Sequence, residues 1–155
     1  MRLKTALLLP LLACALAAAG CRQAGTGGVA GGAGVASSGD VDSVIGKLNS
    51  FTTELSNTVE VASDANAGVE AAQKLLDSRK AELTASVAAL KRDAKFQQDA
   101  AARRKWLEAE VDDTDRVSRL QVKFLDTSMR DAAFKSRLDN LVGDYNSIFK
   151  EPETR

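Results

Sequence analysis

Histidine is absent from the 155 residues of the chain. This side chain is the commonest general base, the commonest metal ligand and the group that titrates nearest physiological pH. The sequence also lacks a glycine-rich phosphate loop, a Gly-x-Ser-x-Gly nucleophile elbow and a Cys-x-x-Cys pair. We therefore expect a protein that is not an enzyme and that has no catalytic residues, no metal and no cofactor.

Proline and glycine are scarce in the body of the chain. The two prolines, Pro10 and Pro152, stand near the ends, and beyond residue 40 the only glycines are Gly46, Gly68 and Gly143. Because these two residue types are the usual helix breakers, their scarcity favours long helices. The sequence thus predicts an all-α protein.

The first 20 residues have the layout of an export signal. Arg2 and Lys4 give a positive start, residues 6–16 form an almost unbroken apolar run, and residues 17–20 are small. The uncharged run is shorter than the roughly 20 apolar residues that a membrane-spanning helix needs. The pattern predicts a removable signal peptide and not a membrane span.

The sequence Ala-Ala-Gly at residues 18–20 precedes Cys21. This segment resembles the lipobox of bacterial lipoprotein precursors, in which a Leu-like residue and two small residues stand before a cysteine. Here Ala18 takes the place of the leucine. The resemblance implies removal of residues 1–20, a diacylglyceryl group on the Cys21 sulfur, and usually a third acyl chain, such as palmitate, on its amino group.

Two alternative interpretations of the signal remain. Residues 11–14 read Leu-Leu-Ala-Cys, which is closer to the usual lipobox, but cleavage before Cys14 would leave the apolar residues 15–20 on the mature protein. An ordinary secretory signal would be cut after Ala19 or Gly20 and would leave Cys21 as a free thiol.

Two or three acyl chains hold a protein to a bilayer far more firmly than one, because each buried methylene adds about 0.8 kcal/mol. A membrane is thus one expected partner, contacted through the lipid anchor. Similar lipoproteins are often retained at the inner membrane when aspartate follows the cysteine, whereas Arg22 follows it here. The resemblance therefore implies an anchor in the periplasmic leaflet of the outer membrane.

Residues 21–39 connect the signal to the helical region. From residue 24 to 39 they are mostly Gly, Ala and Ser, which offer too little apolar area to fold, and such a coil spans about 22 Å root-mean-square. Loss of Arg2 and Lys4 leaves 19 basic residues of the 21, against 21 acidic ones, so the mature net charge is about −2. We expect a flexible tether and no nucleic-acid partner.

An apolar heptad repeat runs through the next part of the chain: Val41, Leu48, Leu55, Ala62, Val69, Leu76, Leu83 and Leu90. This spacing is typical of coiled coils and helical bundles. Asp40 is suited to cap the first helix. Asn66 and Gly68 tolerate the left-handed backbone of a turn between two helices.

A second apolar stripe advances in steps of three and four: Val117, Leu120, Phe124, Phe134, Leu138, Leu141, Tyr145 and Ile148. Asp113 or Thr114 is suited to cap its helix. The stripes predict an elongated antiparallel three-helix bundle or coiled coil over residues 40–150. Its helices are expected at 40–65, 68–111 and 114–149, before a tail at 151–155.

The aromatic residues keep helical spacing, and the following are expected in the core: Phe51, Phe124, Phe134, Tyr145 and Phe149. Thr127 and Asp131 interrupt the second stripe. Either they are buried polar groups that set the register of the bundle, or they face an uncovered flank of the helix.

The middle helix loses its apolar face between residues 91 and 105. Either this part projects into solvent, where it offers a binding surface or a self-association seam, or a break lies near Asp93. Because a continuous helix over 68–111 would be longer than its neighbours, part of it would lack a partner.

Two charged clusters have a functional and a plain interpretation. The acidic cluster, Glu108, Glu110, Asp112, Asp113 and Asp115, suggests calcium, but the spacing lacks the glycine and closing glutamate of an EF-hand, which favours a helix cap with solvated charge. The basic run, Arg103, Arg104 and Lys105 beside Trp106, suggests contact with phosphates or lipid headgroups. A solvated helix face is favoured instead.

These observations predict a lipid-anchored, non-enzymatic protein of the cell envelope that acts through helical protein contacts, as a spacer, accessory subunit or assembly factor. Its expected partners are an unidentified envelope protein or a second copy of the chain. The alternative is a soluble periplasmic chaperone or binding module that grips clients along the exposed part of the middle helix.

Overall fold

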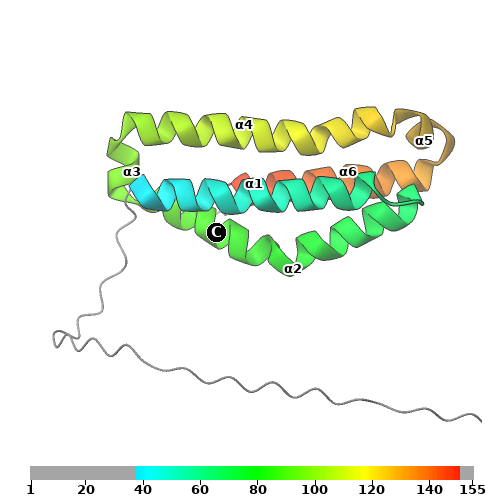
Figure 1. Cartoon of the computed structure of the whole chain (residues 1–155), viewed down its shortest axis with the longest axis horizontal. Coiled ribbons are helices and arrows are strands. Elements are labelled where there is room, and N and C mark those ends of the chain that lie inside the picture. Colours follow the sequence, from blue (N-terminus) through cyan, green and yellow to red (C-terminus); the bar gives the residue numbers. More distant parts are fainter. Residues whose placement is uncertain (1–37, 151–155) are drawn as a thin grey trace, which may run out of the picture. The chain divides into compact units, whose positions relative to one another are not determined.

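The structure, a computed structural model, describes residues 38–150. They form six helices and a 3-10 turn: α1 (Ser38–Glu60), α2 (Ala65–Arg92), α3 (Ala94–Gln98), α4 (Ala100–Lys123), α5 (Leu125–Arg130), α6 (Ala132–Asn146) and η1 (Ser147–Phe149) (Figure 1). The predicted all-α bundle is confirmed. The signal peptide, Cys21, the tether and the C-terminal tail lie outside the described residues.

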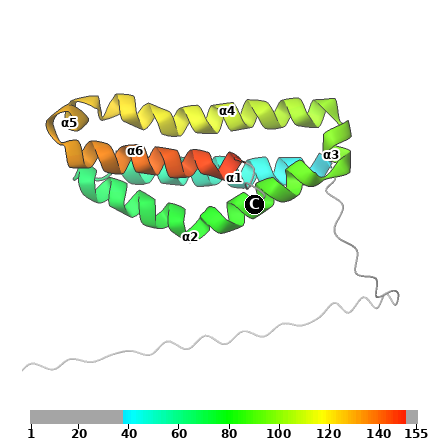
Figure 2. The ribbon, with the colours of Figure 1, turned by 180° about the vertical axis from the view of Figure 1, so that it is seen from behind.

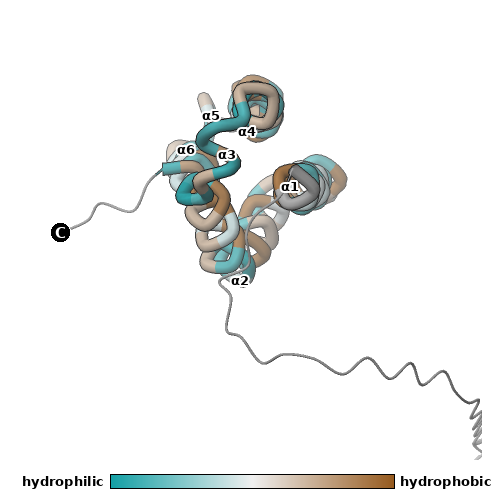
Figure 3. Tube along the Cα trace, turned by 90° about the vertical axis from the view of Figure 1, so that its left-hand side faces the viewer, coloured by the Kyte–Doolittle hydropathy of each residue, from teal (hydrophilic) through white to brown (hydrophobic). Residues whose placement is uncertain are grey.

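Four long helices surround one core. α1 packs against α2 and α4, and α6 packs against the same two helices. An end-on view places α1 and α6 at opposite corners, as it does α2 and α4 (Figure 3). α3 therefore crosses one end of the bundle diagonally to connect α2 with α4 (Figure 2). As a result α1 runs parallel to α4, and α2 runs parallel to α6 (Figure 1).

The predicted division into three helices is wrong. The expected middle helix, 68–111, is broken between α2 and α3 and again between α3 and α4. The expected boundary near residue 113 lies in the middle of α4, and the expected last helix is interrupted after Lys123 and after Arg130. The break near Asp93 is thus present, and the alternative of a helix end projecting into solvent is wrong.

All the breaks except the one at Phe124 coincide with Asp–Ala steps, where the aspartate caps the helix that follows. Asp64, Asp93, Asp99 and Asp131 each precede an alanine and accept a hydrogen bond from a backbone N–H of the first turn. In α3, Asp93 Oδ1 accepts from the N–H of Phe96 at 2.8 Å. These bonds satisfy donors that a helix start leaves unpaired.

Asp131 is therefore neither a register device nor part of an uncovered flank. Its Oδ1 accepts hydrogen bonds from the N–H groups of Ala133 and Phe134, both at 2.9 Å. Thr127 is partly exposed, and its carbonyl accepts the N–H of Asp131 at 2.9 Å. At the other end of the bundle, α1 begins at Ser38, so Asp40 lies in the first turn of the helix and not before it.

Gly68 serves close packing and not a left-handed turn. Both Asn66 and Gly68 lie inside α2. A Cβ at Gly68 would stand 2.8 Å from the Cβ of Ala62 and 3.0 Å from the carbonyl oxygen of Val59. The missing side chain therefore lets the start of α2 approach the end of α1.

The predicted aromatic core is confirmed for four of the five residues: Phe51, Phe134, Tyr145 and Phe149 are buried. The fifth, Phe124, is partly buried and packs against Phe134 with ring centroids 5.8 Å apart. The heptad positions of α1 and α2 are buried too, apart from Ala62, which lies in the connection between the two helices.

Candidate functional site

α4 has the most unusual distribution of side chains in the bundle. Of its 24 residues, five are buried: Ala102, Trp106, Asp113, Val117 and Leu120. Three large apolar side chains instead face outward, because Leu107, Val111 and Val122 are 58%, 62% and 74% exposed. The helix thus has an inner face that contains a carboxylate and an outer face that contains apolar groups.

The outer apolar groups form one stripe. At 3.6 residues per turn, Leu107, Val111 and Val122 fall within a sector of about 60° of the helix surface. Thr114 and Ser118, both partly exposed, fill the gap between Val111 and Val122. We call these five residues the outer face of α4. Exposed apolar side chains aligned on one side of a helix mark contact surfaces more often than scattered ones do.

The apolar exposure continues past the end of α4. In α5, which follows directly, Leu125 is 55% and Met129 is 77% exposed. Methionine is common at binding surfaces because its flexible thioether adapts to different partners. The candidate contact surface therefore extends from the middle of α4 to the end of the bundle at which α5 lies.

Asp113 lies on the inner face of α4, and nothing of it is exposed to solvent. When the side-chain amide of Asn49 in α1 is turned so that its nitrogen faces Asp113, it donates to both carboxylate oxygens, at 2.9 and 3.0 Å. Thr52 of α1 lies beside the carboxylate and is also fully buried. Its hydroxyl is 2.5 Å from the hydroxyl of Tyr145 in α6. Polar side chains from three helices thus meet in the core.

Burial determines the ionisation of this cluster. Desolvation raises the pKa of Asp113 from 3.8 to about 6, against the opposing effects of the Thr52 hydroxyl and the Arg116 guanidinium. Burial also raises the pKa of Tyr145 above its usual value of 10.0, so its hydroxyl stays protonated. Asp113 therefore changes its charge near pH 6 in the folded protein.

The acidic cluster of the sequence is neither a helix cap nor a calcium loop. All five of its members lie within α4, whose continuous helix leaves no loop to surround an ion. Asp113 points into the core, while Asp115 pairs with Arg119 on the same helix. Within residues 38–150, no three carboxylates or other metal-binding groups are placed to hold a metal ion.

The basic run does not present a tryptophan to a membrane. Trp106 is only 2% exposed and packs against Phe149 with ring centroids 6.1 Å apart. Lys105 Nζ lies 2.5 Å from Asp42 Oδ1 in α1, and Arg103 and Arg104 are exposed. The interpretation that used Trp106 as a lipid contact is therefore wrong, and the solvated helix face describes the run correctly.

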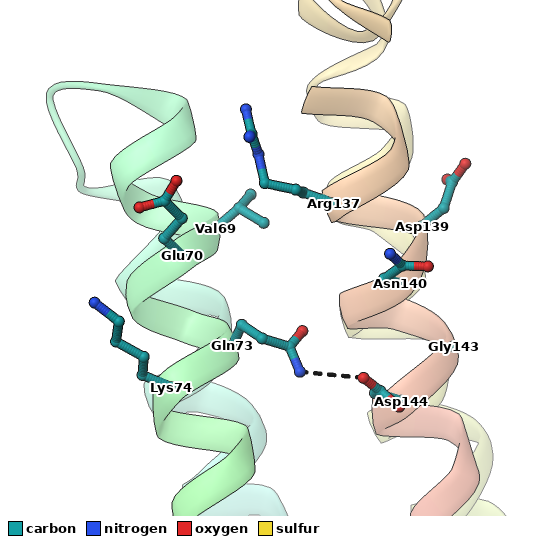
Figure 4. Close-up of a pocket in the computed structure, with 9 residues that line it drawn as sticks. All are labelled: Val69, Glu70, Gln73, Lys74, Arg137, Asp139, Asn140, Gly143 and Asp144. Atoms are coloured by element: carbon teal, nitrogen blue, oxygen red, sulfur yellow. Dashed lines mark hydrogen bonds between the residues drawn. The ribbon is translucent and has the colours of Figure 1, made fainter. Parts of the chain in front are cut away.

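A groove of about 590 Å³ lies between the parallel helices α2 and α6 (Figure 4). Its polar lining residues are Glu70, Gln73, Lys74, Arg137, Asp139, Asn140 and Asp144. Asp144 accepts hydrogen bonds from Gln73 at 3.1 Å and from Lys80 at 2.9 Å, and Arg137 donates to Asn66. Because side chains of both charges line the groove, it favours no one class of ligand, and we treat the outer face of α4 as the stronger candidate site.

No protein-family model, curated protein or solved structure matches the chain. None of the helices in residues 38–150 is long and apolar enough to cross a membrane. The candidate site therefore rests on the geometry of this chain alone.

Two features of the sequence indicate the buried carboxylate and the outer face, although the apolar stripes alone did not predict them. Asp113 stands four residues before Val117 and seven after Trp106, so it occupies a core position of the stripe when that stripe is extended toward the start of α4. The exposed Leu107 and Val111 lie four residues apart, off that stripe, which indicates a second apolar side on the same helix.

Proposed function

We propose that the protein is a lipid-anchored, non-enzymatic component of the cell envelope that acts by protein contact through α4. The observation that carries the contact is the outer face of α4, with Leu107, Val111 and Val122 more than half exposed. Monomeric proteins seldom leave large apolar side chains aligned on one exposed face without a partner.

The anchor is supported by the sequence around Cys21. A short apolar signal ends in Ala-Ala-Gly-Cys, and a Gly-, Ala- and Ser-rich tether of residues 24–39 follows. Such a tether lets a folded domain reach about 22 Å from the bilayer. With Arg22 after the cysteine, the proposed location is the periplasmic face of the outer membrane.

Metabolic labelling tests the anchor. Cells that produce the chain are grown with radioactive palmitate, beside cells that produce the Cys21→Ala variant. The proposal predicts a labelled band for the wild-type chain and none for the variant. A wild-type band as unlabelled as that of the variant would contradict the anchor, and Cys14→Ala is the matched control that should keep its label.

The second candidate is a soluble periplasmic module that binds clients through the same outer face. The exposed side chains of α4 and α5 favour it as much as they favour a fixed partner. Cell fractionation separates the two functions. Recovery in the membrane pellet after a high-salt wash supports the anchored protein, whereas release into the periplasmic fraction supports the soluble module.

A further inference from the structure

The residues of the outer face of α4 lie in pairs at equal distances from one midpoint of the helix. Leu107 and Val122 lie at equal sequence distances on the two sides of a midpoint between Thr114 and Asp115, and so do Val111 and Ser118. In a two-fold contact between identical subunits the same patch meets itself, so each such pair forms twice, and here Val111 of one copy meets Ser118 of the other. When a second α4 lies antiparallel across the first, Leu107 of each copy meets Val122 of the other.

The charged residues beside this face are also complementary when two α4 helices lie antiparallel. Glu108, Asp112 and Arg119 lie on one side of the outer face of α4, the acidic pair before the midpoint and the arginine after it. In an antiparallel pair the same sides of the two helices meet. Arg119 of one copy, which also pairs with Asp115 of its own helix, therefore lies between Glu108 and Asp112 of the other, twice in each dimer. Complementary charges of this kind fix register and orientation.

A bilayer is a poorer fit to this face. Helices that lie on membranes carry lysine and arginine on their polar side and are attracted to anionic lipids. Along its middle the outer face of α4 is bordered by Glu108, Asp112 and Asp115, and the exposed Arg103 and Arg104 lie only near the start of the helix. An anionic surface would repel these carboxylates, whereas a second copy offers Arg119 to them.

We propose that two copies of the chain dimerise through the outer faces of their α4 helices, arranged antiparallel about a two-fold axis near Thr114. A contact between two helix faces is small, at the low end of the size range of specific interfaces, below roughly 1,200 Å² in total. The dimer is therefore weak in dilute solution. This inference rests on the proposed anchor for its strength in the cell, because copies held in one bilayer have a high effective concentration.

Site-specific crosslinking in intact cells tests the dimer. The full chain with Thr114→Cys is produced in cells, which are treated with a short bismaleimide. Because Thr114 lies beside the two-fold axis, its replacement should give a homodimer band that Ser78→Cys, a matched exposed position on α2, does not give. Adding Leu107→Glu and Val122→Glu should reduce the Thr114→Cys band at least tenfold.

The wild-type chain distinguishes failure of the anchor from failure of the dimer. With Cys14 removed and Cys21 lipidated, it has no thiol and gives no crosslink. A wild-type crosslink would show a free Cys21 and contradict the anchor alone. The Thr114→Cys chain that also carries Cys14→Ala and Cys21→Ala, purified and concentrated, then tests the contact by itself.

Charge reversal tests the orientation of the dimer. Arg119→Glu should weaken the Thr114→Cys dimer band, and addition of Glu108→Arg and Asp112→Arg should restore it. The dimer is contradicted when Thr114→Cys crosslinks no better than Ser78→Cys in concentrated purified protein. It is also contradicted when the Thr114→Cys band joins this chain to a different protein only.

Discussion

Asp113 is the residue at which sequence and environment conflict most. A carboxylate with no exposed surface would be costly as a charge without partners, and the amide of Asn49 and the hydroxyl of Thr52 reduce that cost. Buried polar groups of this kind can fix the register of packed helices while lowering stability. Here they would fix α4 against α1 and α6.

The raised pKa of Asp113 gives a pH dependence with a definite sign. Since the pKa of Asp113 in the folded state is about 6 against an ordinary value of 3.8, the folded protein binds a proton more tightly than the unfolded chain. The contribution of protonated Asp113 to stability is fully present below about pH 4 and is lost as the pH rises through about 6. The free energy of unfolding should therefore fall between about pH 4 and 6 and level off above.

We predict that Asp113→Asn stabilises the protein at pH 7 by about 1–3 kcal/mol and flattens this pH dependence, because about 1.4 kcal/mol corresponds to each pKa unit. Urea unfolding between pH 4 and 8 measures both effects. Glu108→Gln, at an exposed position of α4 that does not shift the pKa of Asp113, is the control and should change neither. A destabilised Asp113→Asn variant at pH 7 would show that the ionised carboxylate is needed for packing.

Glycine substitutions separate close packing from conformational freedom. Gly68→Ala should destabilise the protein by about 1–3 kcal/mol, because the new methyl group overlaps Ala62 and the Val59 carbonyl. At Gly46 and Gly143 a Cβ would have no described neighbour within 4 Å. Alanine at either position should therefore stabilise by about 0.5–1 kcal/mol. Thermal unfolding of the three variants checks the order, and a stable Gly68→Ala protein would contradict the close approach.

Which single residues are buried was only partly predictable from the sequence. The sequence placed Phe51, Phe134 and Tyr145 in the core correctly, because large aromatic side chains at helical spacing are rarely left exposed. It placed Asp113 at a helix cap, since aspartate is common there. Only the contacts with α1 show that this aspartate is buried.

At the scale of helices, Asp–Ala steps mark where α2, α3, α4 and α6 begin. α3 and α4 are separated by Asp99, whose Oδ1 accepts the N–H groups of Ala101 and Ala102 at 2.9 and 3.0 Å. This cap allows the chain to change direction after the diagonal crossover. Without it, these two N–H groups at the start of α4 would need other partners.

We predict that Asp99→Ala destabilises the protein by about 1 kcal/mol, whereas Asp99→Asn and Asp99→Ser stay close to the wild type, because all three polar residues cap helices. Urea unfolding at pH 7 is the measurement. An Asp99→Ala protein as stable as the wild type would mean that α4 does not depend on this cap.

The outer face of α4 makes a different prediction. Leu107→Glu with Val122→Glu should change the free energy of unfolding by less than about 0.5 kcal/mol per residue, because neither side chain is part of the core. The matched substitution Leu120→Glu, at a position 1% exposed, should unfold the protein. Circular dichroism during thermal unfolding distinguishes the two. A large loss of stability in the double variant would place the outer face inside the fold.

The sequence predicted correctly that these segments are helical, but it did not predict where the helices begin and end. Heptad spacing gave helices at the correct places in α1, α2 and α6. The connections at Asp93 and Asp99 contain neither proline nor glycine, and alanine, the best helix former, follows each aspartate. Local propensity therefore favoured a continuous helix, and tertiary packing of Phe96 into the core fixed the break.

For the whole molecule, an apolar repeat alone does not specify which helices are neighbours. The heptads of α1 and α2 predicted an antiparallel pair, which is present (Figure 1). The parallel pairing of α1 with α4 follows from the diagonal path of α3, only five residues long. A predicted three-helix bundle left no place for such a crossover, so the parallel neighbours could not be foreseen.

The same arrangement explains why α4 is suited to contact other proteins. It packs against α1 and α6 only among the long helices, and its opposite side carries the outer face. A tethered bundle that presents one such helix needs no active site to act as a spacer or an assembly subunit. Both proposed roles depend on the location of the chain at a membrane.

The intact mass of the mature protein, purified from the membranes of its own cells, tests that location most directly. The account predicts a chain that begins at Cys21 and carries the added mass of a diacylglyceryl group, with a third acyl chain where the amino group is also modified. A mature chain whose Cys21 has the mass of unmodified cysteine would contradict the anchor and the envelope role that depends on it.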